Sequence, residues 1–392
     1  MGACGEEGEE HMFRKKGGLI WLSLVSSLLG MHPSFAQGFS AESEWERLGD
    51  MTDRRAFHGL IALADGSVLA VGGAMASNPL RTAERLRLEG CEDTCAWRSV
   101  GSMAVTRVRL KGVLLPDGRV LVSGGGGLGA NRTAELFDPE SEEWRVTGSM
   151  SRGRVAHTLT LLPNGRVLAI GGHIGPTPTT ELYDPETELW TDAADMAVGR
   201  ALHTATLLAD GRVLVVGGTL DRRAEIYDPD TGVWSGAGVT NAIHRGDATA
   251  TLLNNGQVLV VGGFVADTRT EIFDPEEGTW TEVSRTLDAR KTHIATLLPD
   301  SNRVLVAGGY VEAPGRTEQI RSAEVYDPTS DSWTQIVAMS TGRSVGAGVL
   351  LGQRFLVAGG IYVLDCDNES DCFPSMTTAT EILNLEELNL PQ

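Results

Sequence analysis

The feature that most constrains this chain is a pair of adjacent glycines that recurs seven times at nearly constant spacing. Successive pairs lie 52, 47, 46, 45, 46 and 51 residues apart. This period is too short for independent domains and suits one small sheet of four short strands with its turns. The seven units must therefore pack on one another to bury their faces. The first glycines of the pairs are Gly72, Gly124, Gly171, Gly217, Gly262, Gly308 and Gly359.

The sequence within one unit indicates its strands. Residues 200–218 place two apolar runs around an Asp-Gly turn, which predicts a hairpin buried on both faces. Residues 224–234 add a third strand, an Asp-Pro turn and a fourth strand that opens with Trp234. Four-stranded twisted sheets of this size bury their faces by packing around an axis. The predicted fold class is all-β, a seven-bladed β-propeller with four-stranded antiparallel blades.

The two ends of the repeat are each incomplete, and the fragments complement one another. Trp45 precedes the first double glycine, whereas the last unit stops after its third strand at residues 380–385. We predict that residues near Trp45 form the outer strand of the last blade. Ring closure of this kind removes an open sheet edge that would invite aggregation.

The repeat resembles the kelch motif. Its marks are the double glycine after the second strand, an aromatic residue in the third and a Trp in the fourth. The resemblance covers residues 43–385 and implies a kelch-type propeller; the first and last units depart from it, with Leu86 and Leu383 at the aromatic position. The aromatic residues of the other five units are Phe137, Tyr183, Tyr227, Phe273 and Tyr326.

Among enzymes of this architecture, the chain resembles galactose oxidase, and it does so only in its repeat pattern. The copper-radical chemistry of that family needs Tyr and His ligands and a cysteine linked to a tyrosine. Here three of the five tyrosines belong to the repeat motif, and the four cysteines that follow residue 36 fall in close pairs. We therefore expect no copper site, and no catalytic residue is assigned.

Each unit carries an arginine before its first strand and a glutamate at the start of its third. In an up-and-down sheet both positions lie at the same end of the blade, so each pair predicts a structural ion pair. A ring of free cations for an anionic ligand is the alternative, which the equal number of carboxylates disfavours. The arginines are Arg55, Arg107, Arg154, Arg200, Arg245, Arg290 and Arg343, and the glutamates are Glu84, Glu135, Glu181, Glu225, Glu271, Glu324 and Glu381.

Four units place a histidine three residues after the arginine. Four imidazoles can hold a metal ion, but residues repeated in separate blades are more often structural, and we assign no metal site. The residues are His58, His157, His203 and His293.

The N-terminal residues are typical of a secretory signal peptide. Basic residues 14–16 precede an apolar stretch at 17–31, and Ser34 and Ala36 suit a cleavage site. The predicted organisation is a signal peptide at 1–36, with Met12 as the better translational start, a propeller at 43–385 and a short tail at 386–392. We expect a secreted protein, periplasmic or extracellular, with no stable membrane span after cleavage.

Four cysteines remain after removal of the signal peptide, as two close pairs. An even number in local pairs suits an oxidising compartment and predicts two loop disulfides. Zinc binding is the alternative, although neither pair has the spacing of a zinc knuckle. The pairs are Cys91 with Cys95 and Cys366 with Cys372.

A net charge of −19 argues against nucleic acid as a partner, because a phosphate backbone would be repelled. Departures from the repeat are therefore the best guide to function. The connections between second and third strands are longest in the last two units and carry tyrosines and charges suited to a sugar or a protein partner. The candidate ligand-binding residues are Tyr310, Glu312, Arg316, Tyr362, Asp365, Asp367 and Asp371.

These observations predict an exported binding or scaffold module that recognises a carbohydrate or a protein through loops on one propeller face. No cofactor is expected, although the acidic residues of the last connection leave Ca²⁺ open. The alternative is a carbohydrate-active enzyme, an isomerase, lyase or oxidase, with an axial pocket lined by convergent carboxylates.

Overall fold

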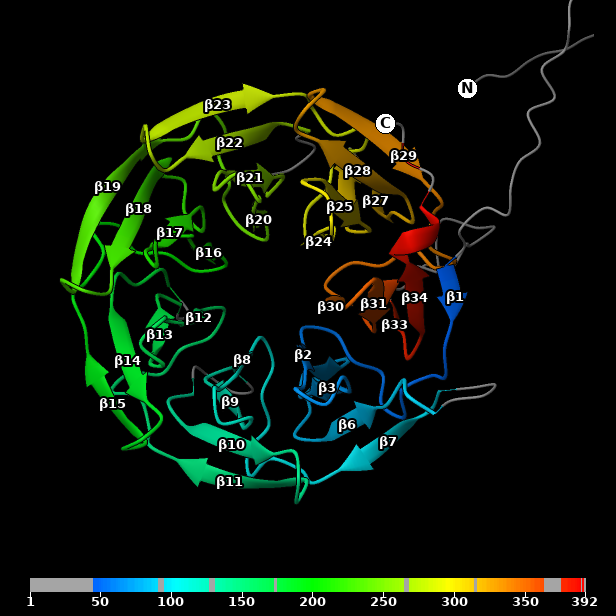
Figure 1. Cartoon of the computed structure of the whole chain (residues 1–392). Helices are drawn as coiled ribbons and strands as arrows, with labels where there is room; N and C mark the ends of the chain where they lie inside the picture. Colours follow the sequence, from blue (N-terminus) through cyan, green and yellow to red (C-terminus); the bar gives the residue numbers. More distant parts are fainter. Residues whose placement is uncertain are drawn as a thin grey trace, which may run out of the picture. The chain divides into compact units, whose positions relative to one another are not determined.

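The computed structural model describes residues 45–90, 95–126, 131–172, 175–263, 268–313, 316–362, 375–388 and 390. These residues lie in one compact unit whose small antiparallel sheets are arranged around an axis (Figure 1). Seven of the sheets have four strands each, and three further two-stranded hairpins extend from the blades. The prediction of an all-β, seven-bladed propeller is confirmed.

Each blade has one inner strand, two middle strands and one outer strand. The first three blades are β2 (Gly59–Ala62), β3 (Val68–Val71), β6 (Ala83–Leu86) and β7 (Trp97–Val100); β8 (Lys111–Leu114), β9 (Val120–Ser123), β10 (Ala134–Asp138) and β11 (Glu143–Thr147); and β12 (Thr158–Leu161), β13 (Val167–Ile170), β14 (Thr180–Asp184) and β15 (Leu189–Asp192). Blades four and five are β16 (Thr204–Leu207), β17 (Val213–Val216), β18 (Arg223–Asp228) and β19 (Val233–Val239); and β20 (Thr249–Leu252), β21 (Val258–Val261), β22 (Thr270–Asp274) and β23 (Thr279–Val283).

The last two blades and the hairpins complete the fold. Blade six is β24 (Ile294–Leu297), β25 (Val304–Ala307), β28 (Ala323–Asp327) and β29 (Ser332–Ile336), and blade seven is β30 (Ala347–Leu351), β31 (Arg354–Ala358), β34 (Thr380–Asn384) and β1 (Trp45–Arg47). The hairpins are β4 (Ala74–Met75) with β5 (Asn78–Pro79), β26 (Tyr310–Ala313) with β27 (Arg316–Gln319), and β32 (Ile361–Tyr362) with β33 (Ser375–Met376); a 3₁₀ helix, η1 (Leu385–Glu387), follows β34.

Local sequence explains the turns within a blade. In blade four the Asp210 carboxylate accepts a hydrogen bond from the backbone N–H of Arg212, and Gly211 adopts φ 86°. Only glycine takes that conformation without strain. The resulting hairpin pairs β16 with β17, and the side chains of β17 are fully buried, as the unbroken apolar run predicts.

The double glycine has a structural role between blades rather than within one. The N–H of Gly172 donates to the carbonyl of Arg200 in the next blade, at 2.8 Å. A Cβ at Gly171 would lie 2.5 Å from that same carbonyl oxygen, and both glycines have positive φ. The pair therefore lets the entry loop of the next blade approach the backbone closely, and it recurs because every blade boundary needs the same contact.

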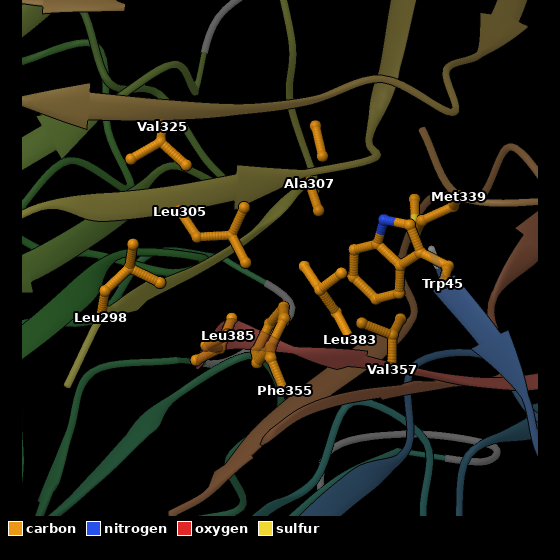
Figure 2. Packing of buried hydrophobic residues seen from close by; sticks show 11 residues of the cluster. Trp45, Leu298, Leu305, Ala307, Val325, Met339, Phe355, Val357, Leu383 and Leu385 are labelled. Carbon is orange, nitrogen blue, oxygen red and sulfur yellow. The ribbon is translucent and has the colours of Figure 1, made fainter. Parts of the chain in front are cut away.

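The N-terminal strand closes the ring. Strand β1 pairs antiparallel with β34, with Trp45 opposite Leu383, so the predicted completion of the last blade is confirmed. Figure 2 shows the Trp45 side chain among apolar residues of blades six and seven, including Leu305 and Phe355. Trp45 thus takes the place in blade seven that a tryptophan of the fourth strand takes in the other blades.

The structure also bears on membrane association. Among the described residues, no helix has the length and apolar character needed to cross a bilayer.

Candidate functional site

Seven residues, one from each blade, form a closed ring of backbone hydrogen bonds where the inner strands begin. Each N–H donates to the carbonyl of its counterpart in the preceding blade, with N···O distances of 2.9 to 3.3 Å. All seven have φ between 48° and 59° although none is glycine, a conformation that L residues rarely adopt. The ring therefore joins all seven entry loops. Its members are Phe57, Arg109, Ala156, Leu202, Asp247, Thr292 and Val345.

A cavity of about 220 Å³ lies on the axis, lined by the ring and by the residues that follow it in every blade. The inner strands that surround it contact one another in a complete circle (Figure 1). Its charged lining residues are Arg109 and Lys111 from blade two and Asp247 from blade five. No role was predicted for these three residues from the sequence. Their only signal is a charge at positions that are mostly uncharged in the other blades.

The predicted ion pairs are formed in six blades. In blade three, Nη2 of Arg154 donates to Oε1 of Glu181 at 2.8 Å, and the same guanidinium donates to the carbonyl of Gly171. The arginine side chains are fully buried and the glutamates at most 5% exposed, so these cations are not available to a ligand in the channel. The pairs are Arg55–Glu84, Arg107–Glu135, Arg154–Glu181, Arg200–Glu225, Arg290–Glu324 and Arg343–Glu381.

The assignment of Arg245 in blade five is wrong. Arg245 is exposed, and Nε2 of His244 lies 3.2 Å from Oε1 of Glu271 in its place. The cause is one additional residue in the entry loop, since His244 precedes Thr249 by five positions whereas Arg200 precedes Thr204 by four. His244 also takes the backbone role of the arginine, because its carbonyl accepts from the N–H of Gly218.

The four repeated histidines lie at separate blade boundaries. Rings of His157, His203 and His293 are hydrogen-bonded through Nε2 to hydroxyls of the preceding blade, at 2.8 to 3.1 Å. Each of the four also packs its Cε1 against the first glycine of the preceding blade's pair. No group of three or more His, Cys, Asp or Glu able to hold a metal ion occurs within the described ranges. These rings therefore pack between blades, where all four also line the axial cavity.

Burial keeps these imidazoles neutral. Burial, together with the neighbouring arginines of the ion pairs, lowers the pKa of His58, His203 and His293 from 6.5 to about 3. The pKa of His157 lies well below 6.5 for the same reason. In the unfolded chain the same rings titrate near 6.5. The unfolded state therefore binds more protons below that pH. The free energy of unfolding consequently decreases as the pH falls from 6.5 towards 3.

We expect His203→Gln to weaken the pH dependence of stability. Between pH 6.5 and 5 one such histidine contributes a loss of about 2 kcal/mol in the free energy of unfolding, which glutamine cannot contribute. Urea denaturation of both proteins at pH 7.5 and pH 5 measures the difference. An equal loss in wild type and variant would show that His203 is not held neutral.

Sequence comparison bears on the repeat directly. The model of the kelch motif matches residues 158–197 and 300–340, which fall in blades three and six. The chain is a kelch-repeat β-propeller. No curated protein matches it.

Many solved structures match the chain, and one of them illustrates the shared architecture. A fungal alcohol oxidase of the AA5 family, in complex with copper, superposes on this kelch propeller with a TM-score of 0.70. The match covers 87% of this chain and 76% of the oxidase chain at 16% sequence identity. A likeness at that identity concerns the fold alone.

Three hairpins project from adjacent blades of the kelch propeller, beside the axial ring. Isolated bridges pair Ala56 with Ala74, Lys291 with Tyr310 and Ser344 with Ile361. In each pair the first residue directly precedes a member of the ring, so the hairpins of blades one, six and seven all start at the cavity mouth. The backbone N–H of Ala76 also reaches Sδ of Met376 at 3.2 Å, which links the hairpins of blades one and seven.

The predicted ligand-binding residues are only partly described. Tyr310 and Tyr362 are half-buried in β26 and β32, and Nζ of Lys291 lies 4.5 Å from the ring centroid of Tyr310. Glu312 and Arg316 lie in the paired strands β26 and β27. Asp365, Asp367 and Asp371 lie outside the described residues, as do Cys91, Cys366 and Cys372. Of the four cysteines in the two predicted disulfides, only Cys95 is described. Both disulfides therefore stay predictions.

Proposed function

We propose that this kelch propeller is an exported module that binds a protein or carbohydrate partner on the face that carries the axial mouth. The kelch propeller fold supports a binding or scaffold role. The observation that carries the proposal is the wall formed by three hairpins from blades six, seven and one, which start next to the axial ring. In blade four the same connection is short, between Val216 and Arg223. Within the described ranges, the connections of blades one, six and seven therefore carry paired strands that the short connection of blade four lacks.

The exposed side chains of this wall suit a partner surface. Met75 is 42% exposed at the end of β4, while Tyr310, Tyr362 and Met376 are half-buried in their hairpins. Tyrosine offers a flat apolar face with a polar tip, and methionine adapts to irregular surfaces. Both features favour contact with a sugar ring or an apolar patch of a protein.

The enzyme alternative requires convergent carboxylates in an axial pocket. Asp247 is the one carboxylate among the residues that line the cavity in the described part of the chain. The glutamates that open each third strand are engaged by buried arginines or by His244. These observations favour binding over an isomerase, lyase or oxidase that works through convergent carboxylates in the axial pocket.

The test is binding of purified protein to a glycan array and to proteins of the cell envelope, with a Tyr310→Ala/Tyr362→Ala variant. We expect a captured partner to be lost, with at least tenfold weaker binding, in this variant. Leu220→Ser is the matched control, because Leu220 is 62% exposed on the short connection of blade four. A repeat in EDTA tests the calcium hypothesis.

The outcomes separate the partner classes. A defined glycan lost in the tyrosine variant supports a lectin-like module, and a purified envelope protein lost in that variant but kept by Leu220→Ser supports a protein scaffold. Equal binding by the tyrosine variant and wild type would place the contact elsewhere and contradict the proposal.

A further inference from the structure

The axial cavity, at whose mouth the hairpins start, carries charges of its own. Arg109 belongs to the hydrogen-bonded ring. Lys111, two residues later in the chain, is the first residue of the inner strand β8. Both come from blade two. Asp247 belongs to the ring in blade five, three blades further round. The lining is therefore polarised, with two cations on one blade and a carboxylate on a distant one.

These charges are departures from the repeat. At the position of Lys111, blades three, four and five carry Thr158, Thr204 and Thr249, each the first residue of its inner strand. The hydroxyls of Thr158 and Thr249 bond the histidines of the following blades. Lys111 cannot take that role, and His157 bonds Ser123 instead. Lys111 therefore does not make the threonine–histidine contact seen in other blades, and we look for another role for its side chain.

None of the three charges is neutralised by its neighbours. Neither Arg109, Lys111 nor Asp247 forms an ion pair within 4 Å with another residue of the described ranges. The Arg109 guanidinium lies 4.1 Å from the ring centroid of Phe57, which holds it at the cavity mouth. Lys111 is exposed to the cavity. Two cations and one anion thus line the axial cavity without forming an ion pair with one another.

The electrostatics of the cavity agree with this separation. Partial dehydration lowers the pKa of Lys111; Asp247 raises it and Arg109 lowers it. Burial raises the pKa of Asp247, which Arg109, Lys111 and Lys291 lower in part. Both charged forms are therefore disfavoured in the empty cavity. A ligand that brings the opposite charge to each wall relieves that cost.

We infer that the axial cavity binds a small molecule that carries a carboxylate at one end and a hydrogen-bond donor at the other. The carboxylate lies against Arg109 and Lys111, and a hydroxyl or ammonium group donates to Asp247. The volume of about 220 Å³ is below the roughly 300 to 1,000 Å³ of sites for drug-sized ligands, which suits an amino acid or a hydroxy acid. This site does not depend on a macromolecular partner at the hairpins.

Calorimetric titration of the purified protein tests the inference. The probes are glycine, β-alanine and γ-aminobutyrate, with glycolate and γ-hydroxybutyrate as hydroxy acids, butyrate as the acid without a donor, and butanol as the alcohol without an acid. We expect at least one amino or hydroxy acid to bind, about tenfold or more tightly than butyrate, and butanol not to bind. The preferred series identifies the donor as ammonium or hydroxyl.

Two variants assign the ends of the ligand. Lys111→Thr restores the residue that blades three to five carry at this position, so it is designed to fold, and it should weaken every acid about tenfold. Asp247→Asn should abolish the preference over butyrate and leave butyrate binding unchanged or stronger. Binding by none of the acids, or equal affinity in Lys111→Thr and wild type, would overturn the inference. Neither result bears on the hairpin wall, whose partner is tested separately with the tyrosine variant.

Discussion

Glu181→Ala should lower the free energy of unfolding by about 3 to 5 kcal/mol, because it leaves the buried Arg154 cation without its counter-ion. Oε1 of Glu181 accepts from Nε and Nη2 of Arg154, and Oε2 accepts from the N–H of Ser151 at 2.6 Å. Three hydrogen bonds are lost together, inside a blade boundary that admits no water to the guanidinium. Urea denaturation at pH 7.5 measures the change.

Two companion variants separate charge from hydrogen bonding and burial. Glu181→Gln keeps one acceptor oxygen and removes the charge, so its loss should lie between wild type and Glu181→Ala. Glu282→Ala removes the partner of Arg285 on an outer strand, where the side chains are 39% and 60% exposed, and should cost less than about 1 kcal/mol. A loss in Glu181→Ala no greater than in Glu282→Ala would refute a structural role for the buried pairs.

The ion pairs illustrate what the sequence could predict. Each arginine lies 16 to 18 residues before the first glycine of its pair, and each glutamate opens a third strand whatever the length of the connection before it. Sheet topology alone brings such positions to one end of a blade. The prediction failed at Arg245. This residue keeps the usual spacing to the double glycine, but the residue before it, His244, makes the contact with Glu271. The backbone hydrogen bond from Gly218 to His244 decides which side chain points into the blade. The spacing of the repeat along the sequence does not contain that information.

The axial cavity could not be predicted in the same way. Arg109 and Asp247 are 138 residues apart in the chain (247 − 109) and share no local motif. Their juxtaposition follows from ring closure, which brings the entry loops of all seven blades to one axis. The only sequence signal was the charge itself, at positions where the other blades carry Phe57, Ala156, Leu202, Thr292 and Val345. Reading the departures from the repeat along the inner strands, as well as in the long connections, would have found it.

Closure of the ring is itself a testable property. Trp45→Ala should lower the free energy of unfolding by about 3 to 5 kcal/mol, because the side chain is only 8% exposed and fills a cluster shared by two blades (Figure 2). Its ring centroid lies 6.2 Å from that of Phe355, and its indole N–H donates to the carbonyl of Val337 at 3.1 Å. Trp45→Phe keeps most of the apolar contact and loses the donor, so about 1 kcal/mol of its effect concerns the hydrogen bond.

The consequence of Trp45→Ala should go beyond the lost contacts, because β1 is only three residues long and holds the edge of β34. Release of β1 exposes the backbone groups of β34 to pairing with another chain. Trp190→Ala is the matched control, since Trp190 lies in blade three, away from the closure, and donates to the carbonyl of Gly148 in the preceding blade. Size-exclusion chromatography near the denaturation midpoint should show association of Trp45→Ala alone. If both variants stay monomeric and lose equal stability, β1 completes the sheet without serving as the latch of the ring.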